Sequence, residues 1–323
     1  MEEKVLVIGG LGFIGFHLVH ALESRNYQVT VSTRSLGNKE VSAVSPIQID
    51  LETMSDEELA PLLGPFQIVV FCGGLDDRNI PTGDAWQYFY KGNVTPCVRL
   101  AKLCSEGKLQ HLVILGSYFS HFNRKHPEWK MQERHPYVYS RRRQELETRE
   151  ALGGKAFLTV LEIPYVFGSA PGMIPLWKPL IDYIYRMPVV FYTKGGTNIC
   201  SVEQVARAIV GILESPIRRD NWIVGGKNVS WKELIKMMAR PMKKRKLVIT
   251  VPNILVYFST IILKLLFKIK GKQSGLDAFH FVSVQTKNTF LDTRESMAML
   301  GYRHVDLQAA IDRTVEACGR AAH

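Results

Sequence analysis

Close to its amino terminus the chain reads Val5-Leu6-Val7-Ile8-Gly9-Gly10-Leu11-Gly12-Phe13-Ile14-Gly15. The four apolar residues predict a buried strand, and apolar residues at helical spacing from Phe16 to Ser24 predict a helix directly after the glycines. Gly9 would allow a tight turn, Gly12 the approach of the backbone to a pyrophosphate, and Gly15 the contact between helix and strand. Free N–H groups at the start of the helix would attract the anion. The stretch therefore predicts a dinucleotide-binding turn.

Further apolar runs alternate with helical patterns along the chain. Strands are expected at residues 28–32, 46–49, 66–71, 111–115, 155–161 and 222–224. Helical spacing extends over 86–106 and begins again after Pro136, and a polar loop is expected over 120–134. This alternation predicts an α/β fold with a doubly wound parallel sheet, of the Rossmann type, in which ligands bind beyond the carboxyl ends of the strands.

A length of 323 residues fits one large domain with a smaller companion. We expect residues 1–168 to form the dinucleotide-binding domain, with returning segments near 195–226 and 290–316. Residues 169–194 and 227–289 would form a smaller, discontinuous substrate domain. A hydrophobic content of 46% is typical of a soluble globular protein.

The formal net charge of +11 is gathered in local clusters, of which residues 141–143 and 243–246 are the densest. Anionic ligands or anionic lipid explain such clusters as well as nucleic acid would. No aromatic-basic RNA signature and no helix-turn-helix pattern accompanies them, so we expect no nucleic-acid partner.

The five cysteines are odd in number and include no CxxC pair. This pattern favours reduced thiols in a cytoplasmic protein and argues against a metal site. The residues Met1 to Lys4 lead directly into the first strand, and no secretory signal is recognised there.

The second strand ends at Thr33-Arg34, where a Rossmann unit selects its cofactor. An acidic residue at this place accepts a hydrogen bond from the ribose 2′-hydroxyl, whereas an arginine pairs with a 2′-phosphate. Because Arg34 is present and no acid is, the sequence favours NADP, with NAD as the alternative. A solvated loop arginine is the other interpretation of Arg34.

Other strand ends supply further candidates. Asp50-Leu51 follows the third expected strand, Cys72-Gly73 the fourth, and Ser117 the fifth. In the helix after Pro136, Tyr137 and Arg141 would lie one turn apart on one face.

These residues resemble an extended short-chain dehydrogenase/reductase of the NAD-dependent epimerase/dehydratase type. The resemblance rests on the glycine turn with Phe13-Ile14, Asp50-Leu51, Asn93, Ser117, Pro136-Tyr137 with Ser140 and Glu145, Ile163-Pro164-Tyr165-Val166-Phe167-Gly168, Ser201 to Ala206, and Asp292 with Leu300-Gly301-Tyr302. It covers most of the chain and is weakest from about Met238 to Thr289.

The resemblance implies the roles of the site residues. Tyr137 would be the general acid/base, Ser117 would orient the substrate oxygen, and Asp50-Leu51 would lie against the adenine. Pro164 and Val166 would line the nicotinamide. The residue four positions after the tyrosine, usually lysine, is Arg141, which would lower the pKa of Tyr137 and hold the ribose hydroxyls.

Two further positions depart from the family pattern. Glu162 replaces an arginine that commonly precedes the nicotinamide loop, and Gln204 replaces the aspartate of a VxDVA helix start. Neither touches the expected chemistry directly.

The stretch 251–272 is unusual because Val251 to Leu263 carries no charge, after which Lys264, Lys268 and Lys272 follow at spacings of four. Its 13 uncharged residues are too few to span a bilayer, which needs about 20. An interfacial helix at the inner face of a membrane, a lid helix and a contact in a homodimer, an assembly common in this family, remain alternatives.

The sequence favours an NADP-dependent carbonyl reductase or alcohol dehydrogenase acting on a small, apolar molecule. Met173, Trp177, Tyr183, Tyr185 and Met187 suit an apolar pocket, with ordinary core packing as the alternative. A nucleotide-sugar epimerase or dehydratase, and a non-catalytic NADP-binding redox sensor, are the alternatives.

Overall fold

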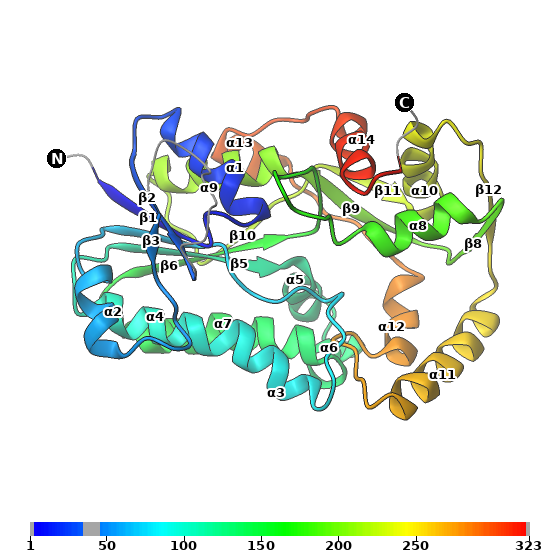
Figure 1. Ribbon diagram of the computed structural model, residues 1–323, viewed down its shortest axis with the longest axis horizontal. Helices are drawn as coiled ribbons and strands as arrows, with labels where there is room; N and C mark the ends of the chain where they lie inside the picture. The colour runs from blue at the N-terminus through cyan, green and yellow to red at the C-terminus, as the bar shows by residue number, and fades with distance from the viewer. Residues whose placement is uncertain (1–2, 35–45, 321–323) are drawn as a thin grey trace.

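The computed structural model describes residues 3–34 and 46–320. Its centre is a seven-stranded sheet in the order β10-β6-β5-β4-β1-β2-β3 (Figure 1), in which every neighbouring pair is parallel. The strands are β1 (Lys4–Ile8), β2 (Gln28–Thr33), β3 (Ile47–Gln48), β4 (Ile68–Phe71), β5 (His111–Ser117), β6 (Phe157–Ile163) and β10 (Asn221–Ile223). The predicted doubly wound sheet is confirmed, and its winding direction reverses between β1 and β4.

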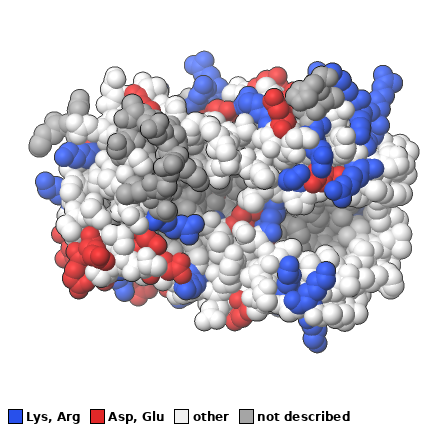
Figure 2. All heavy atoms as spheres, in the orientation of Figure 1, with Lys and Arg blue, Asp and Glu red and all other residues white. Residues whose placement is uncertain are grey.

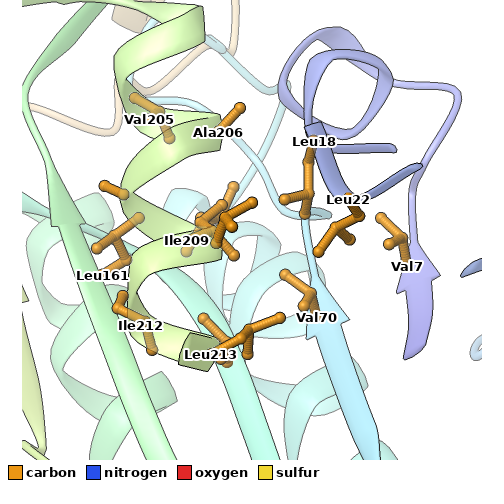
Figure 3. Packing of buried hydrophobic residues seen from close by; sticks show 14 of the residues in the cluster. Val7, Leu18, Leu22, Val70, Leu161, Val205, Ala206, Ile209, Ile212 and Leu213 are labelled. Atoms are coloured by element: carbon orange, nitrogen blue, oxygen red, sulfur yellow. The ribbon is translucent and has the colours of Figure 1, made fainter. Parts of the chain in front are cut away.

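Side chains alternate between the two faces of the sheet, and both faces are buried. Along β1, Val5 and Val7 pack against α1 (Phe13–Glu23) and α9 (Val202–Glu214), whereas Leu6 and Ile8 face the opposite layer. Figure 3 shows how Leu18 and Leu22 of α1 meet Ile209 of α9 over the sheet. Such double burial explains why the strands read as continuous apolar runs.

The opposite layer contains α2 (Asp56–Leu63), α4 (Thr95–Ser105) and α7 (Pro136–Leu152). The helix predicted over 86–106 is interrupted: α3 (Ala85–Phe89) and α4 are joined by a π-helical turn at Tyr90–Val94. That turn holds Asn93, whose buried amide accepts a hydrogen bond from the N–H of Leu75 at 2.6 Å and donates to Ser140 Oγ at 2.9 Å.

The polar loop predicted over 120–134 is wrong. The segment contains α5 (Tyr118–Lys125), a 3-10 turn at Pro127–Trp129 and α6 (Met131–Arg134). The polar residues of this segment suggested a loop. The helix is stabilised instead by two buried aromatic side chains, Phe119 and Phe122, which are each 2% exposed. The hydroxyl of Ser117 caps this helix by accepting the N–H of Phe119 at 3.3 Å.

A second, smaller part of the molecule lies beyond the carboxyl ends of the large sheet (Figure 1). Its strands are β7 (Tyr165–Phe167), β9 (Gly196–Ser201), β11 (Lys227–Ser230) and β13 (Asn288–Thr289) in one sheet, and β8 (Val189–Tyr192) with β12 (Leu247–Thr250) in another. Its helices are α8 (Lys178–Arg186), α10 (Trp231–Ala239) with a 3-10 turn at Arg240–Met242, α11 (Asn253–Ile269), α12 (Ala278–Gln285) and α14 (Leu307–Ala317).

The division of the chain between the two parts differs from the expected one in detail. Of the segment near 195–226, β10 and α9 join the large sheet and its helical layer, but β9 belongs to the smaller sheet. Of the segment near 290–316, α13 (Arg294–Leu300) packs with α9, whereas α14 packs with α8 and α10. Strand β7, which lies inside the expected 1–168 domain, also belongs to the smaller sheet because it pairs with β9. The other expected domain limits stay a prediction. Within the described residues no helix has both the length and the apolar composition needed to cross a membrane.

Candidate active site

A cavity of about 320 Å³ opens at the carboxyl ends of β1, β4, β5 and β6, where the smaller part of the molecule covers the large sheet. It brings together nine of the residues predicted from the sequence: Phe13, Ile14, Cys72, Gly73, Ser117, Tyr137, Arg141, Pro164 and Val166. These residues come from segments distributed over more than 150 positions of the chain. The cavity lies at the point where parallel α/β sheets bind their ligands.

The glycine turn beside the cavity has the geometry predicted for it. Gly9 adopts a φ of +77°, and the N–H of Gly12 donates to Gly9 O at 2.9 Å. A Cβ on Gly15 would lie 2.2 Å from Gly9 O, so helix and strand approach too closely for a side chain. No side chain caps α1 and its first turn holds no acid. The turn therefore fits an anionic pyrophosphate.

Four predicted cofactor residues lie at the ends of β2 and β3, outside the lining of this cavity: Thr33, Arg34, Asp50 and Leu51. Arg34 is exposed. A hydrogen bond from the N–H of Glu52 is the main cause that lowers the pKa of Asp50, and the charge of Arg34 contributes. Arg34 and Asp50 thus lie close enough to interact, at the edge where an adenosine ribose would be expected.

Tyr137 and Ser117 form the polar centre of the cavity. Tyr137, at the start of α7, is 6% exposed, and its N–H donates to Gly275 O at 2.9 Å. Burial raises the pKa of Tyr137, Arg141 and a hydrogen bond with Ser117 lower it, and Asp77 and Asp76 raise it further. Arg141 therefore lowers the pKa of Tyr137 as expected, but the effect of burial is larger and the pKa is raised overall. At neutral pH these groups keep the phenol protonated.

Arg141 lies one turn after Tyr137, with its guanidinium carbon 5.3 Å from the centre of the Tyr137 ring. Nη1 donates to the carbonyl of Leu115 and to Gln144 Oε1, both at 3.0 Å, and Nη2 donates to the carbonyl of Leu75 at 2.9 Å. The guanidinium of Arg141 therefore connects α7 to β5 and to the loop that follows β4. Its expected contact with a ribose stays a prediction.

The charged triplet Asp76-Asp77-Arg78 lines the cavity, and sequence reasoning missed it. Arg78 donates to Asp76 through Nε at 2.6 Å and Nη2 at 2.8 Å, and its guanidinium lies 4.8 Å from the centre of the Trp177 ring. Burial, together with Asp76, raises the pKa of Asp77. The available signal was the position of this triplet, which begins five residues after the end of β4.

The remaining wall is mainly apolar and aromatic. It includes Tyr118, Phe119, Ile163, Tyr165, Met173, Ile174, Leu176 and Trp177. Of the five residues expected to form an apolar pocket, Met173 and Trp177 line the cavity, whereas Tyr183, Tyr185 and Met187 do not. Cys72 also faces it, and burial raises the pKa of this thiol to about 12, so it remains neutral.

The two other departures from the family pattern have structural partners. Glu162 is fully buried in β6 and accepts a hydrogen bond from Arg124 Nη2 at 2.6 Å. Burial raises the pKa of Glu162 to about 7, against the opposing effect of Arg124. Gln204 completes the capping box of α9, where its Oε1 accepts the N–H of Ser201 at 3.1 Å and Ser201 Oγ accepts the N–H of Gln204 at 3.2 Å.

Residues 5–225 match the NAD dependent epimerase/dehydratase family. Among curated proteins, the chain is 26% identical to a sterol-4-alpha-carboxylate 3-dehydrogenase, decarboxylating, of Bos taurus over 70% of the chain and 64% of that protein. It is 21% identical to the protein of the same name from Dictyostelium discoideum over 93% of the chain and 96% of that protein. The chain thus spans less than two thirds of the length of the bovine relative.

Two solved structures share the fold over nearly the whole chain. The crystal structure of gox2253 is 19% identical, with a TM-score of 0.78 over 99% of this chain and 100% of that one. The UDP-glucuronic acid 4-epimerase from Bacillus cereus in complex with NAD is 17% identical, with a TM-score of 0.68 over 98% of each chain.

Proposed function

Because the chain belongs to the NAD-dependent epimerase/dehydratase family, whose members are enzymes of the short-chain dehydrogenase/reductase type that bind NAD(P), we propose that it is an NADP-dependent oxidoreductase acting on an apolar secondary alcohol or ketone. One observation carries the proposal. Ser117 and Tyr137 meet in a cavity whose remaining wall is mostly apolar and aromatic.

Several residues would hold the cofactor. The N–H groups at the start of α1 suit its pyrophosphate, and Cys72-Gly73 with Pro164 and Val166 suit the nicotinamide half. When bound, the nicotinamide supplies or accepts a hydride. The protein's part is to orient the substrate carbon, to exclude water and to move a proton.

Tyr137 is the proposed proton donor. A phenol whose pKa burial raises is protonated at neutral pH, and it can therefore give its proton to a carbonyl oxygen as reduction proceeds. Ser117 would donate a second hydrogen bond to the same oxygen and fix its direction. In the reverse reaction, Tyr137 would accept the proton of the alcohol, and the nearby charge of Arg141 would favour the phenolate.

Two independent observations support an apolar substrate. The wall formed by Phe119, Tyr165 and Trp177 offers rings rather than hydrogen-bond donors. The names of the curated relatives specify a sterol carboxylate, which is a largely apolar molecule. An apolar ring system with an oxygen function near Tyr137 is therefore the substrate class we favour.

A nucleotide sugar is the second candidate, because a solved epimerase has the same fold. Its diphosphate needs cations, and the cavity offers two among the described residues, Arg78 and Arg141. Both already donate to protein groups, Arg78 to Asp76 and Arg141 to the carbonyls of Leu75 and Leu115. This occupation makes the nucleotide sugar the weaker candidate.

The preference for NADP is tested at Arg34. Charge-assisted hydrogen bonds to a 2′-phosphate contribute about 1.5–3 kcal/mol, so NADPH should bind roughly ten- to a hundredfold more tightly than NADH. Fluorescence titration of both reduced cofactors measures the ratio. Arg34→Ala should remove most of the preference for NADPH over NADH. Equal affinities for the two cofactors in the wild type would overturn the assignment of Arg34 to the 2′-phosphate.

The substrate class is tested by assaying cofactor turnover with two groups of compounds. We expect consumption of NADPH with 3-ketosteroids and other bulky apolar ketones, or of NADP with the matching alcohols, and no conversion of UDP-glucose or UDP-glucuronic acid. Conversion of a UDP-sugar alone would favour the epimerase. NADPH binding without turnover of any compound would favour a redox sensor.

A further inference from the structure

Helix α11 exposes one continuous apolar face. Its outward residues are Ile254, Leu255, Phe258, Ile261, Ile262, Leu265, Leu266 and Ile269, which fall on one side of a helix of 3.6 residues per turn. Their exposed fractions range from 48% to 74%, and no residue of α11 is buried. An apolar face of this size on one helix is unusual for a protein surface that contacts only water.

The exposure does not come from a detached helix. The inner side of α11 packs on α12, where the rings of Tyr257 and Phe279 lie 5.2 Å apart and Lys264 Nζ lies 2.8 Å from Asp277 Oδ2. An apolar groove lined by Val256 and Phe267 lies along this contact. Figure 1 shows α11 at the periphery of the molecule with α12 on its inner side.

Both ends of α11 are also held. Before it, β12 pairs with β8 and the N–H of Val251 donates to Tyr192 O at 2.9 Å. After it, the N–H of Gly83 donates to Gly271 O at 2.8 Å. The protein thus presents the apolar face in a fixed orientation.

The stretch of sequence that contains this face carries charge of one sign. Residues 234–276 contain no Asp or Glu and ten Lys or Arg. Four of the ten precede α11 as residues 243–246, and Lys268, Lys270 and Lys272 are exposed at its far end. Figure 2 shows Lys and Arg at this end of the molecule, whereas the acidic side chains of the same view gather mainly at the opposite end, over α2.

We propose that α11 docks this protein on an anionic lipid bilayer. The helix would lie in the plane of the interface, with its outward apolar face among the acyl chains and the flanking cations against lipid phosphates and carboxylates. Its 17 residues and its packed inner side suit a helix on the surface, since spanning requires about 20 residues.

A second copy of the chain fits the face less well. Parallel pairing of α11 with itself would bring Lys268, Lys270 and Lys272 of one copy against those of the other, with no acid in residues 234–276 to neutralise them. A bilayer that contains anionic lipid offers both the apolar interior and the opposite charge. Charge complementarity therefore decides between the two occupants.

The docked orientation would keep the cavity near the bilayer. The segment that follows α11 reaches the active site directly, since the N–H of Tyr137 donates to Gly275 O. The docking proposal itself rests on α11 and its charges, and it stands whichever reaction the cavity carries out.

The test is sedimentation of the full chain with liposomes. We expect the protein to pellet with phosphatidylcholine vesicles that contain 30% phosphatidylserine, and at least tenfold less with pure phosphatidylcholine. Half-molar salt should release it, because the Debye length falls from about 10 Å at 0.1 M to about 3 Å at 1 M. Wild-type protein that stays in the supernatant with the anionic vesicles at low salt would overturn the proposal.

Variants separate the apolar face from the charges. Phe258→Glu combined with Ile262→Glu should reduce binding at least tenfold without lowering the melting temperature, because both side chains are exposed. The matched control is Ile217→Glu, which changes an exposed apolar residue away from α11 and should bind as the wild type does.

Replacing Lys268, Lys270 and Lys272 with Gln should weaken binding and flatten its salt dependence. Unchanged sedimentation of the double glutamate variant would overturn the proposal. So would a dimer in light scattering that the same two substitutions dissociate, because that result would assign the face to a second copy.

Discussion

Arg141 has a structural task as well as an electrostatic one. Its fork donates to two carbonyls at the ends of neighbouring strands and to Gln144, contacts that a single ammonium cannot reproduce together. Its charge also opposes the effect of burial on the pKa of Tyr137. Because arginine replaces the family lysine at position 141, the loop after β4 is held by a hydrogen bond from the guanidinium to the carbonyl of Leu75.

The substitution Arg141→Lys tests this role. It should lower the free energy of unfolding by about 1–3 kcal/mol, because buried carbonyls lose their donors, and should lower turnover as well. Arg143→Lys is the matched control, since Arg143 lies exposed on the same helix with an ion pair to Glu147. Chemical denaturation of both variants measures the difference. An Arg141→Lys protein that is equally stable and more active would mean that neither stability nor turnover depends on the hydrogen bonds of the Arg141 guanidinium.

Glu162 gives stability a pH dependence of known sign. Because burial raises its pKa to about 7, the folded protein holds a proton that the unfolded chain releases near 4.5. Its contribution to stability is thus present below pH 4.5 and is lost as the pH rises to about 7. His111, His121 and His135, whose pKa values burial lowers to about 4, act in the opposite direction over the same range.

The difference between wild type and Glu162→Gln isolates the carboxyl group. Stability of the wild type relative to this variant should fall by about 1–3 kcal/mol between pH 5 and 7.5. Thermal unfolding across that range measures it, with Glu150→Gln on the exposed side of α7 as control. A difference that stays constant with pH would mean that Glu162 is ionised throughout.

At the scale of elements, the strand–turn–helix at β1 and α1 decides where the cofactor can bind. The close contact at Gly15 brings the start of α1 to the end of β1, so that its N–H groups point beyond the sheet. Local sequence was sufficient to predict this unit, because each glycine has its own steric reason.

The substitution Gly15→Ala should damage this unit. Its Cβ would meet the backbone of Gly9 and Gly10, which costs about 1–3 kcal/mol or more, and binding of NADPH should weaken strongly. Gly153→Ala serves as a comparison: Gly153, unlike Gly15, has a positive φ, of 55°, which disfavours a side chain, but no atom lies within 4 Å of the added Cβ. Calorimetry and cofactor titration distinguish the two variants. Normal cofactor binding by Gly15→Ala would contradict the proposed place of the pyrophosphate.

Other elements could not be predicted from local patterns. Helix α5 is stabilised by Phe119 and Phe122 in an aromatic cluster with distant residues, and its own sequence reads as polar. The sheet to which β9 belongs depends on pairing with β11 and β7 rather than on its composition. In both cases tertiary contacts outweigh local preference.

At the scale of the whole molecule, the sequence predicted which strand ends meet at the cavity, but it did not predict all of the side chains that line the cavity between them. Ser117, Tyr137 and Arg141 were found because each follows a recognisable strand or helix start. Asp77 was not, since it lines the cavity together with Trp177, a residue distant in the sequence. The direction of the Tyr137 pKa shift likewise required the folded environment, because burial has no local signature.

The distribution of charge also belongs to the whole molecule. The net charge of +11 indicated an anionic partner, and the stretch 251–272 was one candidate for the surface that binds it. Ten of the cations lie in one acid-free stretch of sequence, residues 234–276, which also contains α11 and its exposed apolar face. The two proposals therefore concern different surfaces, since Tyr137 acts in the cavity and α11 acts on the outside.

The central claim is that Tyr137 moves the proton in a reaction that uses NAD(P). The most direct measurement is the turnover of Tyr137→Phe beside its affinity for NADPH. The account predicts a turnover lowered by about 10²–10⁴-fold and an affinity within about twofold of the wild type, because only the acid/base group is lost. Turnover equal to that of the wild type would contradict it.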